Sequence, residues 1–347
     1  MTVIDYIRQM PKVELHVHIE GSIRPETLLT LAQRNHVDLP FDTLDGLRQW
    51  YTFIDFPHFV DIYVEITRCL KTVDDIELVT REFLQGQAGQ HILHTEATYT
   101  AETVRLLHSI AYDDQLAAIN RARAWARRDL GVTMALIVDI AREVPSDVGV
   151  RIARWAAGAH DMETGVAALG LGGYEVGHPA EKHAAAFKLA RGAGVPCILH
   201  AGETSGPESI WGAIRVADTQ RIGHGVRCVE DPPLVAYLRE KQIPLEVCPT
   251  SNVCLKVCPS LAKHPLPQLL KDGLYVTLNS DDPPMFNTTL TDEYITCANT
   301  FGWDVSTVRQ LVLNAAKAAL LPQPRKRALI ARLAASTVII RRGAELR

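Results

Sequence analysis

Eight short apolar segments alternate with helix-like segments along the whole chain, and this alternation restricts the fold more than any other feature. Strands separated by helices form parallel βα units, because a parallel connection requires a crossover. Eight such units fit a closed (β/α)8 TIM barrel of the α/β class. The segments predicted as strands are Lys12–Ile19, Ile92–Tyr99, Thr133–Ile140, Val166–Gly172, Val195–His200, Gln220–Gly223, Leu245–Cys248 and Leu274–Asn279.

The connection between the first two predicted strands is about 70 residues long, more than a single crossover needs. We expect one domain over residues 1–347, in which residues 25–85 form a helical, lid-like insertion over the catalytic mouth. The apolar run Val338–Arg342 ends in a basic pair and is assigned no function. The helices predicted from apolar periodicity and from proline or glycine at their ends are Pro25–Asn35, Pro57–Leu70, Ala180–Arg191, Pro232–Glu240 and Ser306–Leu321.

Composition excludes several function classes. The 347 residues are 47% hydrophobic, enough for a large core, and the formal net charge of −4 provides no basic field for nucleic acid or an anionic membrane. The N-terminal segment MTVIDYIRQMPK lacks the apolar stretch of a secretion signal, and no uncharged run is long enough to span a bilayer. We therefore expect a cytoplasmic protein that binds neither nucleic acid nor membranes.

Cysteine usage agrees with a reducing compartment. The seven cysteines are an odd number without a CxxC pair. Cys248, Cys254 and Cys258 cluster, but their spacing is not that of a zinc knuckle, so we predict packing thiols.

Histidines and an aspartate at predicted strand ends point to a metal site. His16 and His18 stand two residues apart on one strand, so both imidazoles face the same side. His200 ends another predicted strand and Asp281 follows a third, so all four groups belong at the C-terminal rim of the barrel. Imidazole and carboxylate ligands suit zinc. Taken singly, the histidines are also consistent with hydrogen-bonded core residues, and Asp281 with an ordinary turn.

Three further polar residues at the same rim are candidates for catalysis. Glu203 is placed to shuttle protons to a substrate nitrogen, although it is also placed to cap the next helix. His224 ends the sixth strand, where it either orients a nucleophile or bonds a backbone carbonyl in the core. Asp282 supplies a second carboxylate beside Asp281 for substrate binding.

Five ordered motifs resemble the adenosine and adenine deaminase family of the amidohydrolase superfamily: HVHIEGS (16–22), HAGE (200–203), RIGHG (221–225), EVCPTSN (246–252) and NSDDP (279–283). The resemblance implies a hydrolase that replaces the 6-amino group of a purine by oxygen. It implies one zinc ion per subunit, bound by His16, His18, His200 and Asp281. It further implies that Glu203 protonates N1, that His224 positions the attacking hydroxide, that Asp282 bonds N7, and that Gly173 approaches N3.

Substrate choice is expected to depend on residues beyond the purine ring. The residues expected to bind substrate are His18, Glu20, Gly173 and Asp282. Glu20 stands where adenosine deaminases usually have aspartate, and this difference favours a free base as substrate. Tyr174 stands where adenosine enzymes show aspartate, yet the DSSE-like run of adenine deaminases is missing. LGLGG together with HAGETSGPE is similar to aminodeoxyfutalosine deaminases.

We expect the conversion of adenosine to inosine and ammonia, with adenine (to hypoxanthine) and aminodeoxyfutalosine as alternative substrates. A purine-binding module without catalytic activity is the non-enzyme alternative. A two-metal hydrolase of amides or phosphotriesters is a third interpretation, but the segment VAALGLGG lacks the lysine that would bridge two metals. The expected partner is a small purine base or nucleoside, and the oligomeric state, including a homo-oligomer, is left open.

Overall fold

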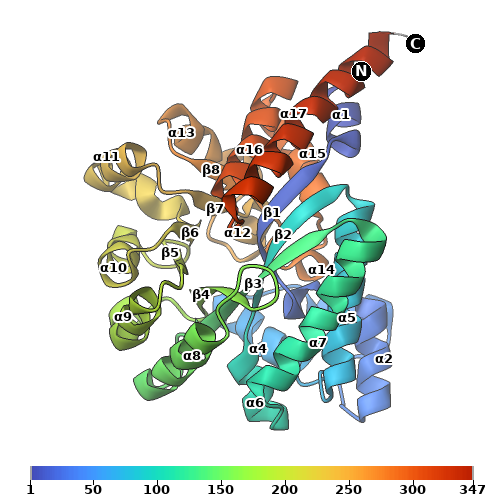
Figure 1. Cartoon of the computed structure of the whole chain (residues 1–347), viewed down its shortest axis with the longest axis vertical. Helices are drawn as coiled ribbons and strands as arrows, with labels where there is room; N and C mark the ends of the chain where they lie inside the picture. Colours follow the sequence, from blue (N-terminus) through green and yellow to red (C-terminus); the bar gives the residue numbers. More distant parts are fainter. Residues whose placement is uncertain (1, 346–347) are drawn as a thin grey trace.

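Eight parallel strands form one sheet in which each strand pairs with the next along the chain, with helices between them (Figure 1). The computed structural model describes residues 2–345, with side chains described through residue 335. The predicted (β/α)8 barrel is confirmed. The strands are β1 (Lys12–His18), β2 (Ile92–Tyr99), β3 (Thr133–Ala141), β4 (Val166–Gly172), β5 (Cys197–Ala201), β6 (Arg221–His224), β7 (Leu245–Val247) and β8 (Val276–Leu278).

The sheet closes between β8 and β1 through two backbone hydrogen bonds of Asp281 with His16 and His18 and through the side chain of Asn279. Val17 and Asp281 form an isolated parallel bridge. Asn279 Oδ1 accepts hydrogen bonds from the backbone amides of Leu15 and His16, at 2.9 and 3.1 Å. This seam joins the strand that carries His16 to the segment that carries Asp281.

Helices surround the barrel and extend beyond the strand connections. All predicted helices are present, but Ala180–Arg191 begins with a 3₁₀ turn over Ala180–His183, and the run Val338–Arg342 lies inside the last helix. The helices are α1 (Val3–Gln9), α2 (Pro25–Asn35), α3 (Leu44–Trp50), α4 (Phe56–Thr67), α5 (Val73–Gly89), α6 (Ala101–His108), α7 (Tyr112–Trp125), α8 (Ser146–Gly158), α9 (Ala184–Gly192), α10 (Pro207–Ala217), α11 (Pro232–Lys241), α12 (Pro249–Cys254), α13 (Leu266–Lys271), α14 (Pro283–Phe286), α15 (Leu290–Phe301), α16 (Val305–Ala318) and α17 (Gln323–Glu345).

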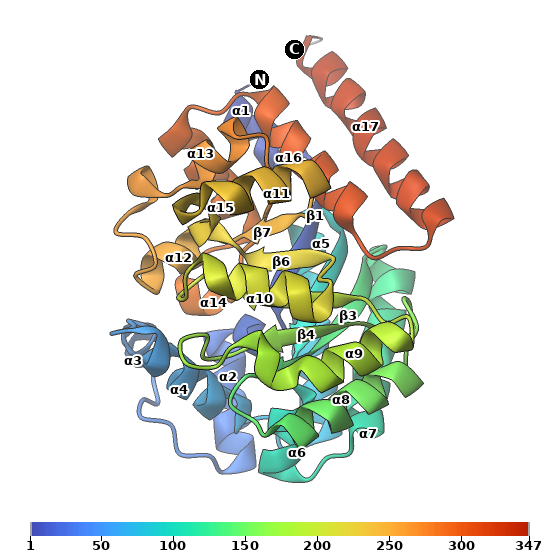
Figure 2. The ribbon, with the colours of Figure 1, turned by 90° about the vertical axis from the view of Figure 1, so that its left-hand side faces the viewer.

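The insertion after β1 divides into two parts. Helix α5 packs against α7 beside β2 and so acts as the crossover helix of the first βα unit. Helices α2, α3 and α4 lie together at one end of the molecule (Figure 2). α4 contributes Phe56, Phe59 and Tyr63 to a cavity at the C-terminal ends of the strands. Helix α4 therefore lies beside the cavity, and a lid-like role of residues 25–85 within a single domain stays a prediction.

Two remaining expectations concern the environment of the chain. Within residues 2–345, no helix combines the length and the apolar character that a bilayer crossing requires. All seven cysteines are free thiols, and only Cys254 among them is not fully buried.

Candidate active site and metal centre

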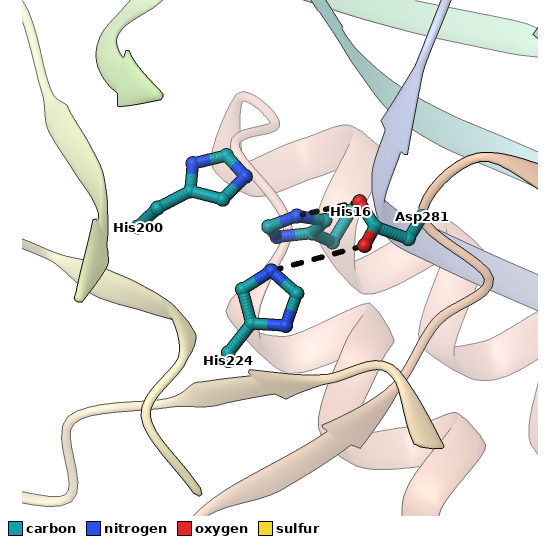
Figure 3. A group of neighbouring side chains, drawn as sticks. All are labelled: His16, His200, His224 and Asp281. Carbon is teal, nitrogen blue, oxygen red and sulfur yellow. Dashed lines mark ion pairs between the residues drawn. The ribbon is translucent and has the colours of Figure 1, made fainter. Parts of the chain in front are cut away.

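Four imidazole rings and one carboxylate gather where the strands end. His16 and His18 come from β1, His200 from β5 and His224 from β6, while Asp281 follows β8. The ring centroid of His16 lies 4.5 Å from that of His200 and 4.9 Å from that of His224. Asp281 faces this group, with Oδ1 at 3.4 Å from His16 Nε2 and Oδ2 at 3.8 Å from His224 Nε2 (Figure 3).

The donor atoms of this cluster fit a divalent metal ion. Two atoms that each bind zinc at about 2.0–2.2 Å lie within about 4.4 Å of one another. His16 Nε2, His18 Nδ1 and Asp281 Oδ1 are buried and lack hydrogen-bond partners within residues 2–345, which is costly for polar atoms unless a ligand satisfies them. Two overlapping sets have donor atoms within 4.8 Å of one another: His16, His200, His224 and Asp281, and His18, Asp281 and Asp282. Three of the expected ligands, His16, His200 and Asp281, therefore share one set with His224, whereas His18 shares a set only with Asp281 and Asp282. Binding of one metal by His16, His18, His200 and Asp281 stays a prediction.

Hydrogen bonds to the outer ring nitrogens decide which lone pairs face the cluster. His16 Nδ1 lies 2.9 Å from Glu246 Oε2, and His200 Nδ1 lies 2.9 Å from the carbonyl oxygen of Leu171. Both partners are acceptors, so each Nδ1 carries the proton and each Nε2 keeps a free lone pair. His16 and His200 are thereby in the tautomer that binds a metal through Nε2.

His224 is held in the opposite tautomer by a relay that begins at a backbone amide. The N–H of Leu266 donates to His264 Nδ1 at 3.0 Å, so His264 Nε2 carries a proton and donates to Asn252 Oδ1 at 3.1 Å. Asn252 must then turn its amide nitrogen toward His224 Nδ1, 3.3 Å away. His224 Nδ1 accepts, and the N–H of Nε2 points toward the cluster. This favours the expected role of orienting a nucleophile over that of a ligand.

Burial controls the protonation of these groups. It lowers the pKa of His224 to about 3 and, together with the nearby His16 and His18, holds the pKa of His200 well below its usual value. Burial by itself raises the pKa of Asp281, but the close contacts of its Oδ1 with the rings of His16 and His18 bring it well below its ordinary value. His16 and His18 differ from His200 and His224. Burial alone would lower their pKa, but Asp281 and Glu246 raise the pKa of His16 to about 9, and Asp282 and Asp281 raise that of His18 well above its usual value. A metal ion requires neutral imidazoles, so its binding would displace protons from His16 and His18.

The backbone at the site is unusual in three places. His224 and Asp281 adopt positive φ angles of 60° and 66°, a region that residues other than glycine seldom occupy and that clusters at functional sites. Gly173 has φ 89°, and a Cβ there would stand 2.7 Å from Glu143 Oε2. Residue 173 thus has a backbone conformation that favours glycine, at the position where a ligand is expected to approach the main chain.

Glu203 faces the cluster from the loop after β5. Its Oε2 lies 3.6 Å from His224 Nε2, and its Oε1 is buried without a hydrogen-bond partner within residues 2–345. Burial, reinforced by the carboxylates of Asp281, Glu175 and Asp282, raises the pKa of Glu203 well above its usual value. A carboxyl group held protonated in this way is able to donate a proton. Asp282 is also buried, and burial raises its pKa to about 6.

The loop that carries Glu203 is held by a residue that the sequence analysis did not identify. The carboxylate of Glu175 accepts backbone hydrogen bonds from Gly202, Glu203, Thr204 and Ser205, at distances between 2.5 and 3.1 Å. These four amides surround one buried acceptor and fix the position of the loop. No local pattern marks Glu175, because its partners lie about 30 residues away.

A cavity of about 130 Å³ adjoins the cluster. Asp139 and Glu143, at and just after the end of β3, line its far side; the rule that barrel enzymes use strand ends would have identified them. Glu20, an expected substrate ligand, is buried beside Tyr63 and Thr100, which line the cavity, and its contact with a substrate stays a prediction. Its carboxylate accepts hydrogen bonds from the amide of Thr100 and the hydroxyl of Tyr63 at 2.8 and 3.2 Å.

Comparison with known proteins identifies the family. The sequence profile of the family described as adenosine deaminase matches residues 11–336. The chain belongs to the adenosine deaminase family. Its members are metal-dependent hydrolytic deaminases that act on C–N bonds, as the resemblance of the motifs implied.

Individual relatives carry two different substrate names. An aminodeoxyfutalosine deaminase from Streptomyces coelicolor is 37% identical over 92% of this chain and 83% of its own length. An adenine deaminase from Stutzerimonas stutzeri is 36% identical over 91% of this chain and 99% of its own length. The crystal structure of adenine deaminase from Arthrobacter aurescens superposes with a TM-score of 0.90 at 32% identity, covering 94% of this chain and 99% of that one. An amidohydrolase from Burkholderia ambifaria, solved with bound zinc, also has a TM-score of 0.90, at 27% identity over 99% and 95% of the two chains.

Proposed function

We propose that this protein hydrolyses adenine to hypoxanthine and ammonia with one zinc ion per chain. The observation that carries the proposal is that Glu203, a buried carboxyl with a raised pKa, faces the histidine cluster beside a small cavity. His16, His18, His200 and Asp281 are the proposed ligands. A zinc ion bound there would lower the pKa of a coordinated water toward about 7 and so supply a nucleophile at neutral pH.

Each of the protein's own groups then interacts with one atom of the purine or with the attacking oxygen. Glu203 donates its proton to N1 as oxygen adds to C6, which prevents negative charge from building on the ring. The N–H of His224 Nε2 donates a hydrogen bond to the attacking oxygen and fixes its direction. Asp282 bonds N7, and the backbone at Gly173 meets N3.

The cavity favours the free base over a nucleoside. Its volume of about 130 Å³ is below the roughly 300 Å³ at which sites for drug-sized ligands begin. Going around the purine, the ring nitrogens come in the order N1, N3, N9. Going around the barrel, Glu203 (β5), Gly173 (β4) and Asp139 (β3) come in the same order, so Asp139 would face N9. Asp139 Oδ1 is buried without a hydrogen-bond partner within residues 2–345, so it is free to accept from the N–H of a free base. A nucleoside carries its sugar at that nitrogen.

Two other purines are alternative candidate substrates. Aminodeoxyfutalosine is the second candidate, because relatives of that name reach 37% identity, and its bulky extension would require α4 to move. Adenosine, the substrate favoured from sequence, stays a prediction. Among the described residues that line this cavity there is no lysine or arginine, which disfavours substrates bearing a phosphate.

Purified protein should be assayed with adenine, adenosine and aminodeoxyfutalosine, following absorbance near the adenine maximum and ammonia release. The highest kcat/KM with adenine is expected. A higher value with either nucleoside would overturn the substrate assignment, and no turnover of any of them, with or without measurable binding, would overturn the enzyme assignment.

Glu203→Gln keeps the shape of the side chain but removes the proton donor. We expect kcat to fall by roughly 10²–10⁴-fold while elemental analysis still finds one zinc per chain. Two ions per chain would favour a two-metal hydrolase instead. Chelation of the wild-type protein should abolish activity, and added zinc should restore it.

A further inference from the structure

A second cavity, of about 560 Å³, lies at the other end of the barrel. His94 and Thr133, at the N-terminal ends of β2 and β3, form part of its wall, whereas the histidine cluster lies at the C-terminal ends of the strands. Most of the rest of the wall comes from α7 and the π-helical segment after it (Ala126–Leu130), from the turn before β4 and from the start of α17. The proposed deaminase reaction uses none of these residues.

The wall contains a buried guanidinium without a carboxylate hydrogen-bonded to it. Arg123 is 5% exposed; its Nε donates to the carbonyl of Met134, and its Nη1 donates to the carbonyl of Gly165 and to Asn120 Oδ1. Its Nη2 has no hydrogen-bond partner within residues 2–345. Carbonyl and amide oxygens carry only partial charges, so the positive charge of Arg123 is not neutralised by its contacts.

Three more arginines line the same cavity, and fewer carboxylates than arginines pair with them. Arg127 and Arg325 share Glu163, and the distance from Arg127 Nη1 to Glu163 Oε2 is 3.5 Å. Arg128 pairs with its chain neighbour Asp129 at 2.7 Å. Asp161 is a third carboxylate whose charge acts on Arg123. Together with Arg123, four guanidinium groups therefore face three carboxylates, which leaves a net positive charge around the cavity.

We propose that this cavity is a binding site for a small molecule that carries phosphate. Guanidinium groups bind phosphate oxygens through paired, charge-assisted hydrogen bonds. A cavity of about 560 Å³ is within the usual range for small-molecule sites, roughly 300–1,000 Å³. The two cavities thus differ in charge: carboxylates line the one beside the histidine cluster, and arginines line this one.

Inorganic pyrophosphate is the probe for the test, titrated by calorimetry at low ionic strength into the zinc-loaded, full-length protein. We expect one site with a Kd below about 1 mM. The double variant R127Q/R325Q removes two partly exposed guanidinium groups and should weaken binding by at least about tenfold. Because zinc itself attracts anions, this variant also separates the proposed site from the metal centre, which it leaves intact.

The matched control is R48Q/R68Q, which removes the same charge from two exposed arginines on α3 and just after α4. Its affinity for pyrophosphate should stay within about twofold of wild type. Arg123→Lys, which keeps the charge but loses the fork of donors, should also weaken binding. The proposal is overturned if the wild type does not bind pyrophosphate, or if both double variants weaken binding equally, which would show a general effect of charge.

Discussion

Asn252 Nδ2 lies 3.3 Å from His224 Nδ1, and the same amide accepts a hydrogen bond from His264 through its oxygen. Because His264 takes its orientation from the backbone amide of Leu266, the direction of every bond in this relay is determined. The relay keeps the proton of His224 on Nε2, where it faces Glu203 and Asp281.

Asn252→Asp should reverse the tautomer of His224. A carboxylate at position 252 accepts from both histidines, so the proton of His224 moves to Nδ1 and Nε2 loses its hydrogen. By analogy with the wrong-tautomer effect in serine proteases, we expect kcat to fall by at least about 100-fold. Asn287→Asp, at an exposed position, is the control and should retain activity. Wild-type kcat in the Asn252 variant would contradict the assigned tautomer.

Glu246→Gln should weaken the metal centre. Glu246 accepts hydrogen bonds from His16 and Arg221 through its two different carboxylate oxygens. In glutamine one of these oxygens is replaced by an NH2 group, so one of the two donors loses its acceptor. Loss of such a partner typically reduces metal affinity about 10–100-fold. Chelator competition measures the effect, and Glu240→Gln on the surface of α11 should leave affinity unchanged. Equal affinities in wild type and Glu246→Gln would show that this contact does not orient His16 for metal binding.

Glu175→Gln should lower turnover without removing the metal. In the wild type, backbone N–H groups donate to both oxygens of the Glu175 carboxylate. In the variant one of these oxygens becomes an NH2 group, which cannot accept, so at least one buried backbone N–H is left unsatisfied. A penalty of about 1–3 kcal/mol on the loop predicts a fall in kcat of roughly tenfold or more. Zinc content measured alongside kcat tests this prediction, with Glu181→Gln as an exposed control. A drop in zinc content instead would point to damage at the ligands.

Tyr174→Phe should loosen the cover of the cavity. The hydroxyl of Tyr174 donates to the carbonyl of Pro57 at 3.2 Å, so it ties the loop after β4 to the start of α4. Loss of one hydrogen bond of about 0.5–1.5 kcal/mol predicts a KM about two- to tenfold higher with little change in kcat. Faster hydrogen exchange in α4 should accompany it. Tyr237→Phe on α11 serves as the control, and an unchanged KM for Tyr174→Phe would argue against a lid held at this point.

Glu293→Gln should flatten the pH dependence of stability. Burial raises the pKa of Glu293 to about 7, against a usual 4.5, despite hydrogen bonds from Thr250 and Thr288. The folded state therefore holds a proton that the unfolded state releases, and this group makes the free energy of unfolding fall as pH rises from about 4.5 to 7, by up to about 1.4 kcal/mol per pH unit. Denaturant titrations at several pH values should show a shallower decline in the variant; identical slopes would refute the shift.

Local patterns were sufficient for the barrel and for most of the candidate site. Each strand shows as a short apolar run, and parallel strands place their C-terminal ends on one face, so His16, His200 and Asp281 were expected together. The start of the helix predicted over Ala180–Arg191 was less accurate, because the choice between a 3₁₀ and an α-helical first turn depends on tertiary contacts of residues 180–183.

What the sequence determined by itself was therefore the order of the elements and the chemical groups at their ends, since both depend on short-range periodicity. Only the tertiary structure decided how those groups are supported and separated. Glu175 accepts hydrogen bonds from amides of another loop, and Asn252 sets the tautomer of a histidine 28 residues away. Arg123 is buried, and none of its hydrogen bonds to described residues goes to a carboxylate. Such contacts join residues from different elements, and their energies depend on distance and burial, which no local pattern encodes.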